Sequence, residues 1–351
     1  MRAKQPKKLL IMNILDILRR YSDADHRLSQ KDILDILQNE YEMDADRKAI
    51  KRNLMNLIDF GYHLEYSQSV RRNKHGEEEV IYTDWYLERD FSDAELRLLI
   101  DSLLFSKHIP YSQCKKLIEK IQGLSSRYFK SKVRHVRNLP SDQPQNAELF
   151  YTIEILDEAI ERNRQVVFHY GDYGIDKKLR LRQNKTGEPR NYLVNPYQMV
   201  ATNGRYYLIA NTDKHNNISH YRLDRIRDIE LRKSPAKPQR KVEGLENGLN
   251  LPKHMAEHIY MFSGESQQVI MRTTPDMAGE LIDWFGNGVI FTDETETSVI
   301  AHVKANLQAM RFWALQYAPY VTILSPQSLA DKVKEALRDA LKRYEKQSIE
   351  K

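Results

Sequence analysis

Two stretches of this 351-residue chain carry side chains whose types and spacing could do chemistry. The first, ISHYRLDRI, places His220, Arg222 and Arg225 among aromatic and aliphatic residues. An arginine guanidinium presents planar donors that match phosphate oxygens, and a tyrosine ring offers a face for stacking a base. The stretch therefore predicts binding of an anionic ligand. The alternative is an ordinary surface ion pair, in which Arg225 pairs with Asp224 or Asp228.

The second stretch is HMAEH, in which His254 and His258 lie one helical turn apart and Glu257 stands beside them. The pattern H-x-x-E-H is known from zinc hydrolases. The sequence offers no evident third ligand at a suitable helical spacing, so solvated histidines on a connector are expected. Phosphate-cradling loops, dinucleotide fingerprints and nucleophile elbows are also absent from the sequence. We therefore expect no enzyme activity, no cofactor and no metal.

Positive charge is unevenly distributed along the chain. The formal net charge is +6, yet residues 164–241 hold 17 Lys and Arg against 7 Asp and Glu. A local excess of ten raises the surface potential and favours an anionic partner such as nucleic acid, a nucleotide or phosphate. A solvated basic face is the alternative.

Composition indicates an ordinary soluble protein. Hydrophobic residues make up 41% and charged residues 30% of the chain, and no apolar run reaches the roughly 18 residues that a membrane span needs. A single cysteine, Cys114, excludes an intramolecular disulfide framework. A cytoplasmic location without membrane attachment is expected.

The elements of residues 1–90 change from helical to strand periodicity. Three segments space their apolar residues as helices do, and the third begins after a cap at Asp44 or Asp46 and stops at Gly61. Two alternating segments joined by a basic turn follow and predict a hairpin. Three helices and a hairpin form a winged helix-turn-helix, whose third helix enters the major groove. The residues expected to contact DNA are Arg47, Lys48, Lys51 and Arg52 on the third helix and Arg71, Arg72 and Lys74 in the hairpin.

Four further segments are expected after the hairpin. Residues 91–163 have capped helices and predict a helical linker. Residues 164–233 hold five short strands with Gly and Asn turns, which predict a small, partly open barrel. Residues 234–265 are rich in Pro and Gly and predict a second linker. Residues 266–351 have the order βαββαβα, typical of a ferredoxin-like α/β sandwich, and are expected to support dimerisation.

The segments VNPYQMV, RYYLIA and HYRLDRI together resemble a WYL domain, a small Sm- or SH3-like β-barrel named for a Trp-Tyr-Leu signature. Tyr206, Tyr207 and Leu208 stand at the signature, so tyrosine replaces the tryptophan. The order of the other segments extends the resemblance over most of the chain. The resemblance implies a multidomain α+β protein with a winged helix-turn-helix, a helical linker, a WYL barrel and a C-terminal ferredoxin-like α/β extension domain.

The resemblance also implies a bacterial or archaeal transcription regulator. Such proteins are typically dimers whose WYL domain senses a ligand, in some members a nucleic acid, and several are associated with DNA damage or phage defence. We therefore expect a homodimeric repressor that binds a double-stranded DNA operator and senses an anionic effector, a nucleic acid or nucleotide. The effector-binding residues that the resemblance implies are Tyr197, Tyr207, His220, Arg222 and Arg225.

Two questions stay open in the sequence. The same motifs suit an accessory protein that binds single-stranded nucleic acid through the barrel and modulates a phage-defence or CRISPR effector. In addition, a continuous strand through residues 220–226 would place His220 and Arg222 on one face and Arg225 on the other. Alternation alone does not say which face meets the ligand.

Overall fold

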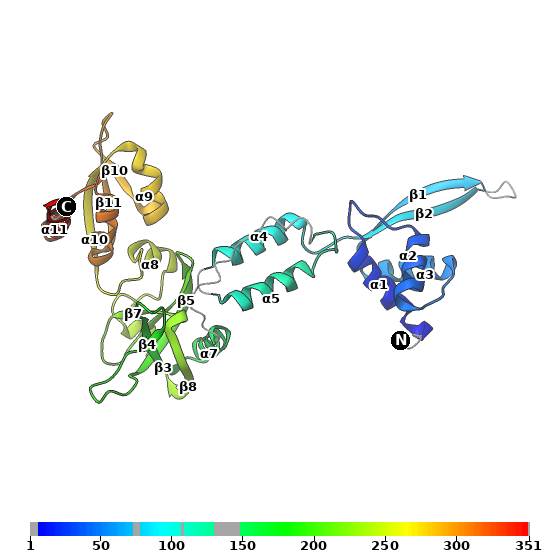
Figure 1. The fold of residues 1–351 in the computed structure, drawn as a ribbon, viewed down its shortest axis with the longest axis horizontal. Coiled ribbons are helices and arrows are strands. Elements are labelled where there is room, and N and C mark those ends of the chain that lie inside the picture. Colours follow the sequence, from blue (N-terminus) through cyan, green and yellow to red (C-terminus); the bar gives the residue numbers. More distant parts are fainter. Residues whose placement is uncertain (1–5, 73–77, 107–108, 130–147, 350–351) are drawn as a thin grey trace. The chain divides into compact units, whose positions relative to one another are not determined.

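The computed structural model describes residues 6–72, 78–106, 109–129 and 148–349 (Figure 1). The chain divides into two compact units, Met1–Gln145 and Asn146–Lys351, each of which is described by itself. Helices dominate the first unit and separate sheets the second, so the expected multidomain α+β class is confirmed. Among the described residues, every helix is too short or too polar to cross a bilayer.

The first unit begins with three helices around one apolar core. The three helices carry the buried residues Ile14, Ile33 and Ile50 on their inward faces. A short 3-10 helix, η1, precedes the first of them. A buried aliphatic side chain stabilises a fold by about 1.5 to 3 kcal/mol relative to leaving it exposed, which is why these faces associate. The bounds are η1 Lys7–Leu9, α1 Leu10–Tyr21, α2 Gln30–Tyr41 and α3 Arg47–Phe60.

Both ends of α3 are fixed by local chemistry. The Asp46 carboxylate accepts a hydrogen bond from the Ala49 amide at 2.7 Å, so Asp46 rather than Asp44 is the N-cap. The helix ends where Gly61 takes a φ of +112°, which other residues rarely adopt.

An antiparallel hairpin, β1 Leu64–Arg72 and β2 Glu78–Leu87, follows α3. Trp85 of β2 is fully buried against the helices, and its backbone bridges to Leu28 in the segment before α2. The hairpin is therefore anchored at its base to the three-helix core. Its tip, residues 73–77, and with it Lys74, lies outside the described residues.

The segment expected as one helical linker is divided between the two units. Helices α4 Asp93–Phe105 and α5 Tyr111–Gln122 pair with each other in the first unit. Helix α7 Leu149–Glu161 belongs to the second unit and packs on three strands of the barrel. The difference arises because α7 buries Leu156 and Ala159, and barrel strands supply the apolar partner.

The barrel of the second unit is a strongly bent antiparallel sheet (Figure 1). The strand order is β4-β3-β5-β6-β7, and β8 pairs with β3, which is thus shared by three neighbours. The prediction of one continuous last strand is wrong, because a 3-10 turn, η2, divides that segment into two strands. The bounds are β3 Arg164–Tyr173, β4 Leu179–Leu181, β5 Asn191–Thr202, β6 Arg205–Asn211, β7 Ile218–Arg222, η2 Leu223–Arg225 and β8 Ile226–Pro235.

Residues 234–265, expected as a linker, are instead packed structure. They contain the end of β8, the short turn η3 Gln239–Lys241 and helix α8 Leu251–Glu257. Val242 and Leu245 are almost completely buried in a cluster with barrel residues. Prolines and glycines shape the backbone of this segment, but its apolar side chains pack against the barrel and form a core with it.

The C-terminal part has the expected element order. Its sheet has the antiparallel order β10-β11-β9-β12, and Val303 of β11 lies opposite Val269 of β9 on a face covered by helices. Trp313 is fully buried in this core. The bounds are β9 Ser266–Thr273, η4 Pro275–Met277, α9 Ala278–Phe285, η5 Gly286–Gly288, β10 Ile290–Thr292, β11 Val299–Asn306, α10 Leu307–Gln316, β12 Thr322–Ser325 and α11 Gln327–Ile349.

The cap of α3 gives a testable prediction. Asp46→Ala should lower the free energy of local opening at the start of α3 by about 1 kcal/mol, because the Ala49 amide loses its acceptor. Hydrogen exchange of the peptide covering residues 47–60 measures this, and exchange should be about fivefold faster. Asp44→Ala is the matched control and should leave the rate unchanged. Equal effects of the two substitutions would contradict the assignment of the cap.

Candidate functional site

The 3-10 turn η2 separates the expected ligand residues into two groups. Strand β7 ends at Arg222, so Arg225 lies in the turn and does not continue the strand alternation. The register pairs Tyr207 with Arg222, and Ile209 with His220, across β6 and β7. Paired residues share a face, so Tyr207, His220 and Arg222 lie together and Arg225 lies apart from them.

Arg222 is committed to an internal ion pair. Its Nη2 and Nε donate to the two carboxylate oxygens of Asp224 at 2.6 and 3.0 Å, and both side chains are largely buried, 17% and 8% exposed. A bidentate pair in a low-dielectric site uses the charge and the donors that a ligand would need. The structure thus assigns Arg222 a role in shaping the turn.

Tyr197 also has an internal partner. Its ring is buried in the apolar cluster with Val242, and its hydroxyl donates to the Lys237 carbonyl at 2.8 Å. Burial raises the pKa of Tyr197 to about 12, so the phenol stays neutral. Tyr207 packs half-buried against the same cluster. Neither ring offers a fully open face for stacking.

His220 meets the two histidines of HMAEH in a cluster of three imidazoles. His220 Nε2 lies 2.9 Å from His254 Nε2, and the centres of the His254 and His258 rings are 4.4 Å apart. Burial, reinforced by the neighbouring imidazoles, lowers the pKa of His220 to about 2 and of His254 to about 4. Burial also lowers the pKa of His258. The three rings are therefore neutral near pH 7, not solvated side chains on a connector as expected.

On the other face of the barrel, four aromatic rings form a cluster that arginines border. The rings are those of Phe168, Tyr170, Tyr192 and Tyr221, with centres 5.2 to 6.4 Å apart. Three guanidinium groups lie over tyrosines at the edge of this cluster: Arg182 over Tyr170, Arg190 over Tyr192 and Arg225 over Tyr173, with distances of 5.2, 4.8 and 5.9 Å to the ring centres. We call these three arginines and three tyrosines the arginine–tyrosine patch.

Asp172 holds two arginines of the patch in place. Arg182 donates to both of its carboxylate oxygens at 2.7 and 3.2 Å, and Arg225 donates to one of them at 2.9 Å. The hydrogen bonds from Arg182 lower the pKa of Asp172 despite partial burial, so the carboxylate is charged. Gly171 allows this arrangement, since a Cβ there would stand 2.7 Å from the Arg180 carbonyl oxygen of β4.

The patch keeps positive charge after this pairing. Three arginines face one carboxylate, and Arg182 and Arg190 are exposed. Among the described residues, Arg225 Nε is also a buried donor without a hydrogen-bond partner. Sequence reasoning missed Arg182 and Arg190 because they lie before β5, far from the HYRLDRI motif.

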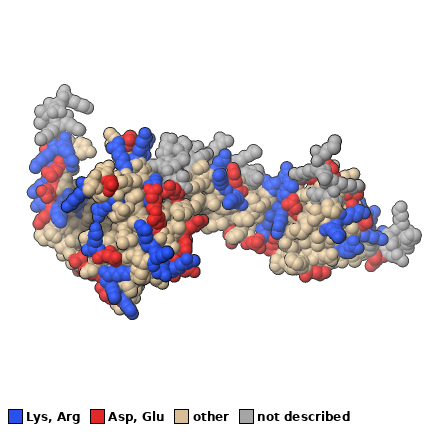
Figure 2. All heavy atoms as spheres, turned by 90° about the horizontal axis from the view of Figure 1, so that it is seen from below, with Lys and Arg blue, Asp and Glu red and all other residues tan. Residues whose placement is uncertain are grey.

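The face of the molecule drawn in Figure 2 carries charges of both signs. On the face drawn in Figure 2, Lys and Arg side chains lie beside Asp and Glu side chains, without one continuous basic surface. On this face the excess of ten in residues 164–241 does not form a single basic surface. Local geometry, as in the patch, has to identify a binding face.

A cavity of about 860 Å³ lies beside the histidine cluster, next to α8 and the start of β9. It is lined by four glutamates and two lysines, and by His254 and His258, which are neutral. Its net charge is negative, so it repels an anionic effector. The arginine–tyrosine patch is consequently the better site for an anion in this unit.

The first unit presents its own set of cations. Arg47, Lys48 and Arg52 of α3 are exposed, and none of them takes part in an ion pair recorded for the described residues. Lys51 is different, because its ammonium lies 4.0 Å from the centre of the Tyr82 ring on β2. A cation over an aromatic face gains about 0.5 to 1 kcal/mol at such a site, so Lys51 braces α3 against the hairpin. Arg71 and Arg72 are exposed near the end of β1.

Comparison with protein families decides the nature of the barrel. The model for the WYL domain matches residues 151–231, which run from α7 into β8. Residues 151–231 therefore form a WYL domain. The model for the WCX domain matches residues 265–341, the C-terminal sheet and its helices. The WYL match begins within α7, in agreement with the packing of that helix on the barrel.

Sixteen chains of solved structures also match this chain. Proteasome accessory factor B/C of Arthrobacter aurescens has 18% identity and a TM-score of 0.29; the match covers 98% of this chain and 50% of that one, so this chain spans half its length. A CRISPR Cas-related protein has 13% identity and a TM-score of 0.37, with 99% and 88% covered. These scores are too low to carry an argument about function. The comparison with curated proteins found no match.

The histidine cluster of the WYL barrel predicts a pH dependence. In the unfolded chain a histidine takes up a proton near pH 6.5, whereas His220 and His254 in the folded chain do so only near pH 2 and 4. The unfolded state thus binds more protons, and the second unit should lose stability as the pH falls below about 6.5. Between pH 7.5 and 5 the loss should be on the order of 1 to 2 kcal/mol per histidine.

Hydrogen exchange of the β7 and α8 peptides at the two pH values, corrected for intrinsic rates, measures this loss. His220→Gln should remove part of the pH dependence. His215→Gln, at an exposed position before β7, should not. An NMR titration in which the His220 ring protonates with a midpoint near pH 6.5 would contradict the burial argument.

Proposed function

We propose that this WYL-domain protein is a DNA-binding transcription regulator that represses in the absence of its ligand. In this proposal the WYL barrel senses an anionic effector, a nucleic acid or a nucleotide, and the chain acts as a homodimer. One observation carries it. Exposed cations on the third helix of a helix-hairpin unit stand on the same chain as a WYL barrel that bears an arginine–tyrosine patch.

The first unit supports the DNA-binding part. In a winged helix-turn-helix the start of the third helix meets base edges, and Arg47 and Lys48 are in the first turn of α3. Arg52 lies one turn further on, and Arg71 and Arg72 are suited to flanking phosphates. Lys51 supports the helix through Tyr82 more than it offers a free contact.

The arginine–tyrosine patch supports the effector part. Arginine forks match phosphate oxygens, so the patch suits the phosphates of a short nucleic acid or nucleotide. Tyr170 and Tyr192 are buried and support Arg182 and Arg190 from below. A phosphate could displace the Asp172 carboxylate from Arg182 and Arg225, because it offers the same kind of acceptor with more charge. Of the residues that the resemblance implied, Arg225 fits this role best.

The C-terminal helix supports dimerisation. Leu337 and Leu341 lie one turn apart on α11 and are 42% and 59% exposed, beyond the part of the helix that packs on its own sheet. Burying such a stripe against a second copy would remove apolar surface from water. A two-fold dimer would present two α3 helices to a pseudo-palindromic operator.

The DNA-binding proposal is tested on the full-length chain. The double substitution Lys48→Ala and Arg52→Ala should weaken binding to the DNA upstream of its own gene at least tenfold, through the loss of contacts worth about 1 to 3 kcal/mol each. Lys115→Ala with Lys116→Ala, exposed on α5, is the matched control. Gel-shift titration measures the affinity, and sedimentation verifies that the dimer persists.

Two outcomes would oppose this proposal. Unchanged affinity of the double variant would exclude α3 as the recognition helix. A footprint without any discrete protected site would favour the accessory protein over the transcription regulator. Relief of operator binding by a short single-stranded oligonucleotide would support a nucleic-acid effector.

The effector site is tested with a fluorescent single-stranded oligonucleotide and anisotropy. Arg182→Ala with Arg190→Ala should weaken binding about tenfold, since two cationic contacts are lost. Asp172→Asn should strengthen binding severalfold, because it removes the carboxylate that competes for Arg182 and Arg225. Arg232→Ala, exposed on β8, serves as the control. If Arg182→Ala with Arg190→Ala leaves binding unchanged, the patch is not the effector site.

A further inference from the structure

The cavity beside α8 is acidic, although the chain as a whole is basic. Its walls come from the β6–β7 loop, the segment that precedes α8, α8 itself, and β9 with β11 of the WCX domain. Lys304 pairs with Glu257 at 3.4 Å, so these two side chains neutralise each other. Glu243, Glu246 and Glu265 then face only Lys253. A chain of net charge +6 thus holds an acidic cavity where its two C-terminal domains meet.

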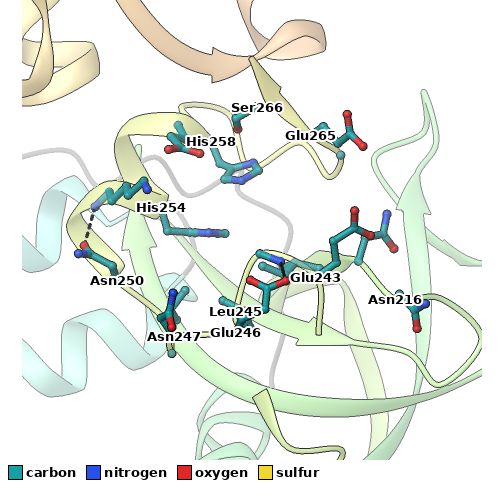
Figure 3. A pocket seen from close by; sticks show the side chains of 18 of the residues that line it. Asn216, Glu243, Leu245, Glu246, Asn247, Asn250, His254, His258, Glu265 and Ser266 are labelled. Carbon is teal, nitrogen blue, oxygen red and sulfur yellow. Dashed lines mark hydrogen bonds between the residues drawn. The ribbon is translucent and has the colours of Figure 1, made fainter. Parts of the chain in front are cut away.

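A buried acceptor also faces this cavity. His258 is 8% exposed, and its Nδ1 lies 2.9 Å from the Phe262 carbonyl oxygen, to which it donates. The ring is neutral, so Nε2 carries the lone pair, and it has no hydrogen-bond partner among the described residues. Figure 3 shows the His254 and His258 rings on one side of the cavity and Glu243, Glu246 and Glu265 around the remainder.

We propose that this cavity binds a small organic polycation of the aliphatic di- or polyamine class. Its ammonium groups would donate to the carboxylates of Glu243, Glu246 and Glu265 and to His258 Nε2. Uncharged acceptors complete the lining: the side-chain amides of Asn216, Asn217, Asn247 and Asn250.

Size and layout favour a polyamine over a point ion. The cavity volume of about 860 Å³ far exceeds that of a single ion, and the carboxylates come from two segments, Glu243 and Glu246 from the one before α8 and Glu265 from the one before β9. Ammonium groups spaced along a flexible chain can reach several of them at once. Among the described residues no three His, Cys, Asp or Glu side chains are grouped to hold a metal ion, so hydrogen-bond acceptance is the chemistry that the lining offers as it stands.

The site is distinct from the proposed effector site. Bound there, a polyamine would touch both the WYL barrel and the WCX domain. It would also lie beside His254, whose Nε2 contacts His220 on β7. The proposal does not depend on DNA binding, because the ligand and its contacts lie wholly within the second unit.

Isothermal titration of the full-length chain with spermidine, in low salt and without nucleic acid, tests the proposal. One equivalent should bind, and Glu243→Gln with Glu265→Gln should weaken binding at least tenfold. His258→Phe, which keeps a ring but removes the acceptor, should weaken it severalfold. Glu230→Gln, at an exposed carboxylate on β8, is the matched control and should bind as the unchanged chain does.

Three results would overturn the proposal. The first is an absence of heat at millimolar spermidine while circular dichroism shows an intact fold. The second is equal weakening by Glu230→Gln, which would mean unspecific attraction to surface charge. The third is stoichiometric binding of Zn²⁺ that spermidine does not compete with and that His258→Phe abolishes, which would mean a metal site. Protection of residues 243–258 from hydrogen exchange by spermidine would locate the ligand.

Discussion

The buried ion pair between Arg222 and Asp224 is the interaction on which the barrel depends most. It closes the 3-10 turn that ends β7 and allows β8 to turn back along β3. The Arg222 amide also donates to the Tyr170 hydroxyl, which ties the turn to the aromatic cluster. Loss of one partner would leave the other charge buried and unpaired, a cost of about 3 to 5 kcal/mol. The pair is therefore structural first, although its arginine belongs to the motif that suggested ligand binding.

Charged and ionisable side chains of the HYRLDRI segment point to two different faces of the barrel. Arg225 is directed to Asp172 and Tyr173, where arginines and tyrosines accumulate. His220 is directed to α8, where imidazoles and carboxylates accumulate. One face thus suits anions and the other suits cations.

Much of the fold was predictable because it rests on local signals. Helix periodicity, the cap and Gly61 stop of the third helix, and the βαββαβα order of residues 266–351 correctly predicted the type and order of these elements. Two features were not predictable in this way. The pairing of Arg222 with Asp224 bends the chain against the strand pattern, and the burial of Val242 and Leu245 depends on partners distant in sequence. The proline and glycine content of residues 234–265 indicated turns in the backbone but could not indicate that the segment packs against the barrel.

The candidate sites were predictable only where one segment supplied them. The exposed cations of α3 follow from helix geometry, since the buried face of Ile50 and Leu54 leaves Arg47, Lys48 and Arg52 outside. The arginine–tyrosine patch needed β3, β4 and the turn η2 to meet, so Arg182 and Arg190 carried no signal of their own. HMAEH was recognised as a pair of histidines, but its partner His220 comes from a strand thirty-four residues earlier. Desolvation lowers the pKa of all three imidazoles, so they stay neutral in mildly acidic solution too, and the charge of the cavity beside them is set by its glutamates.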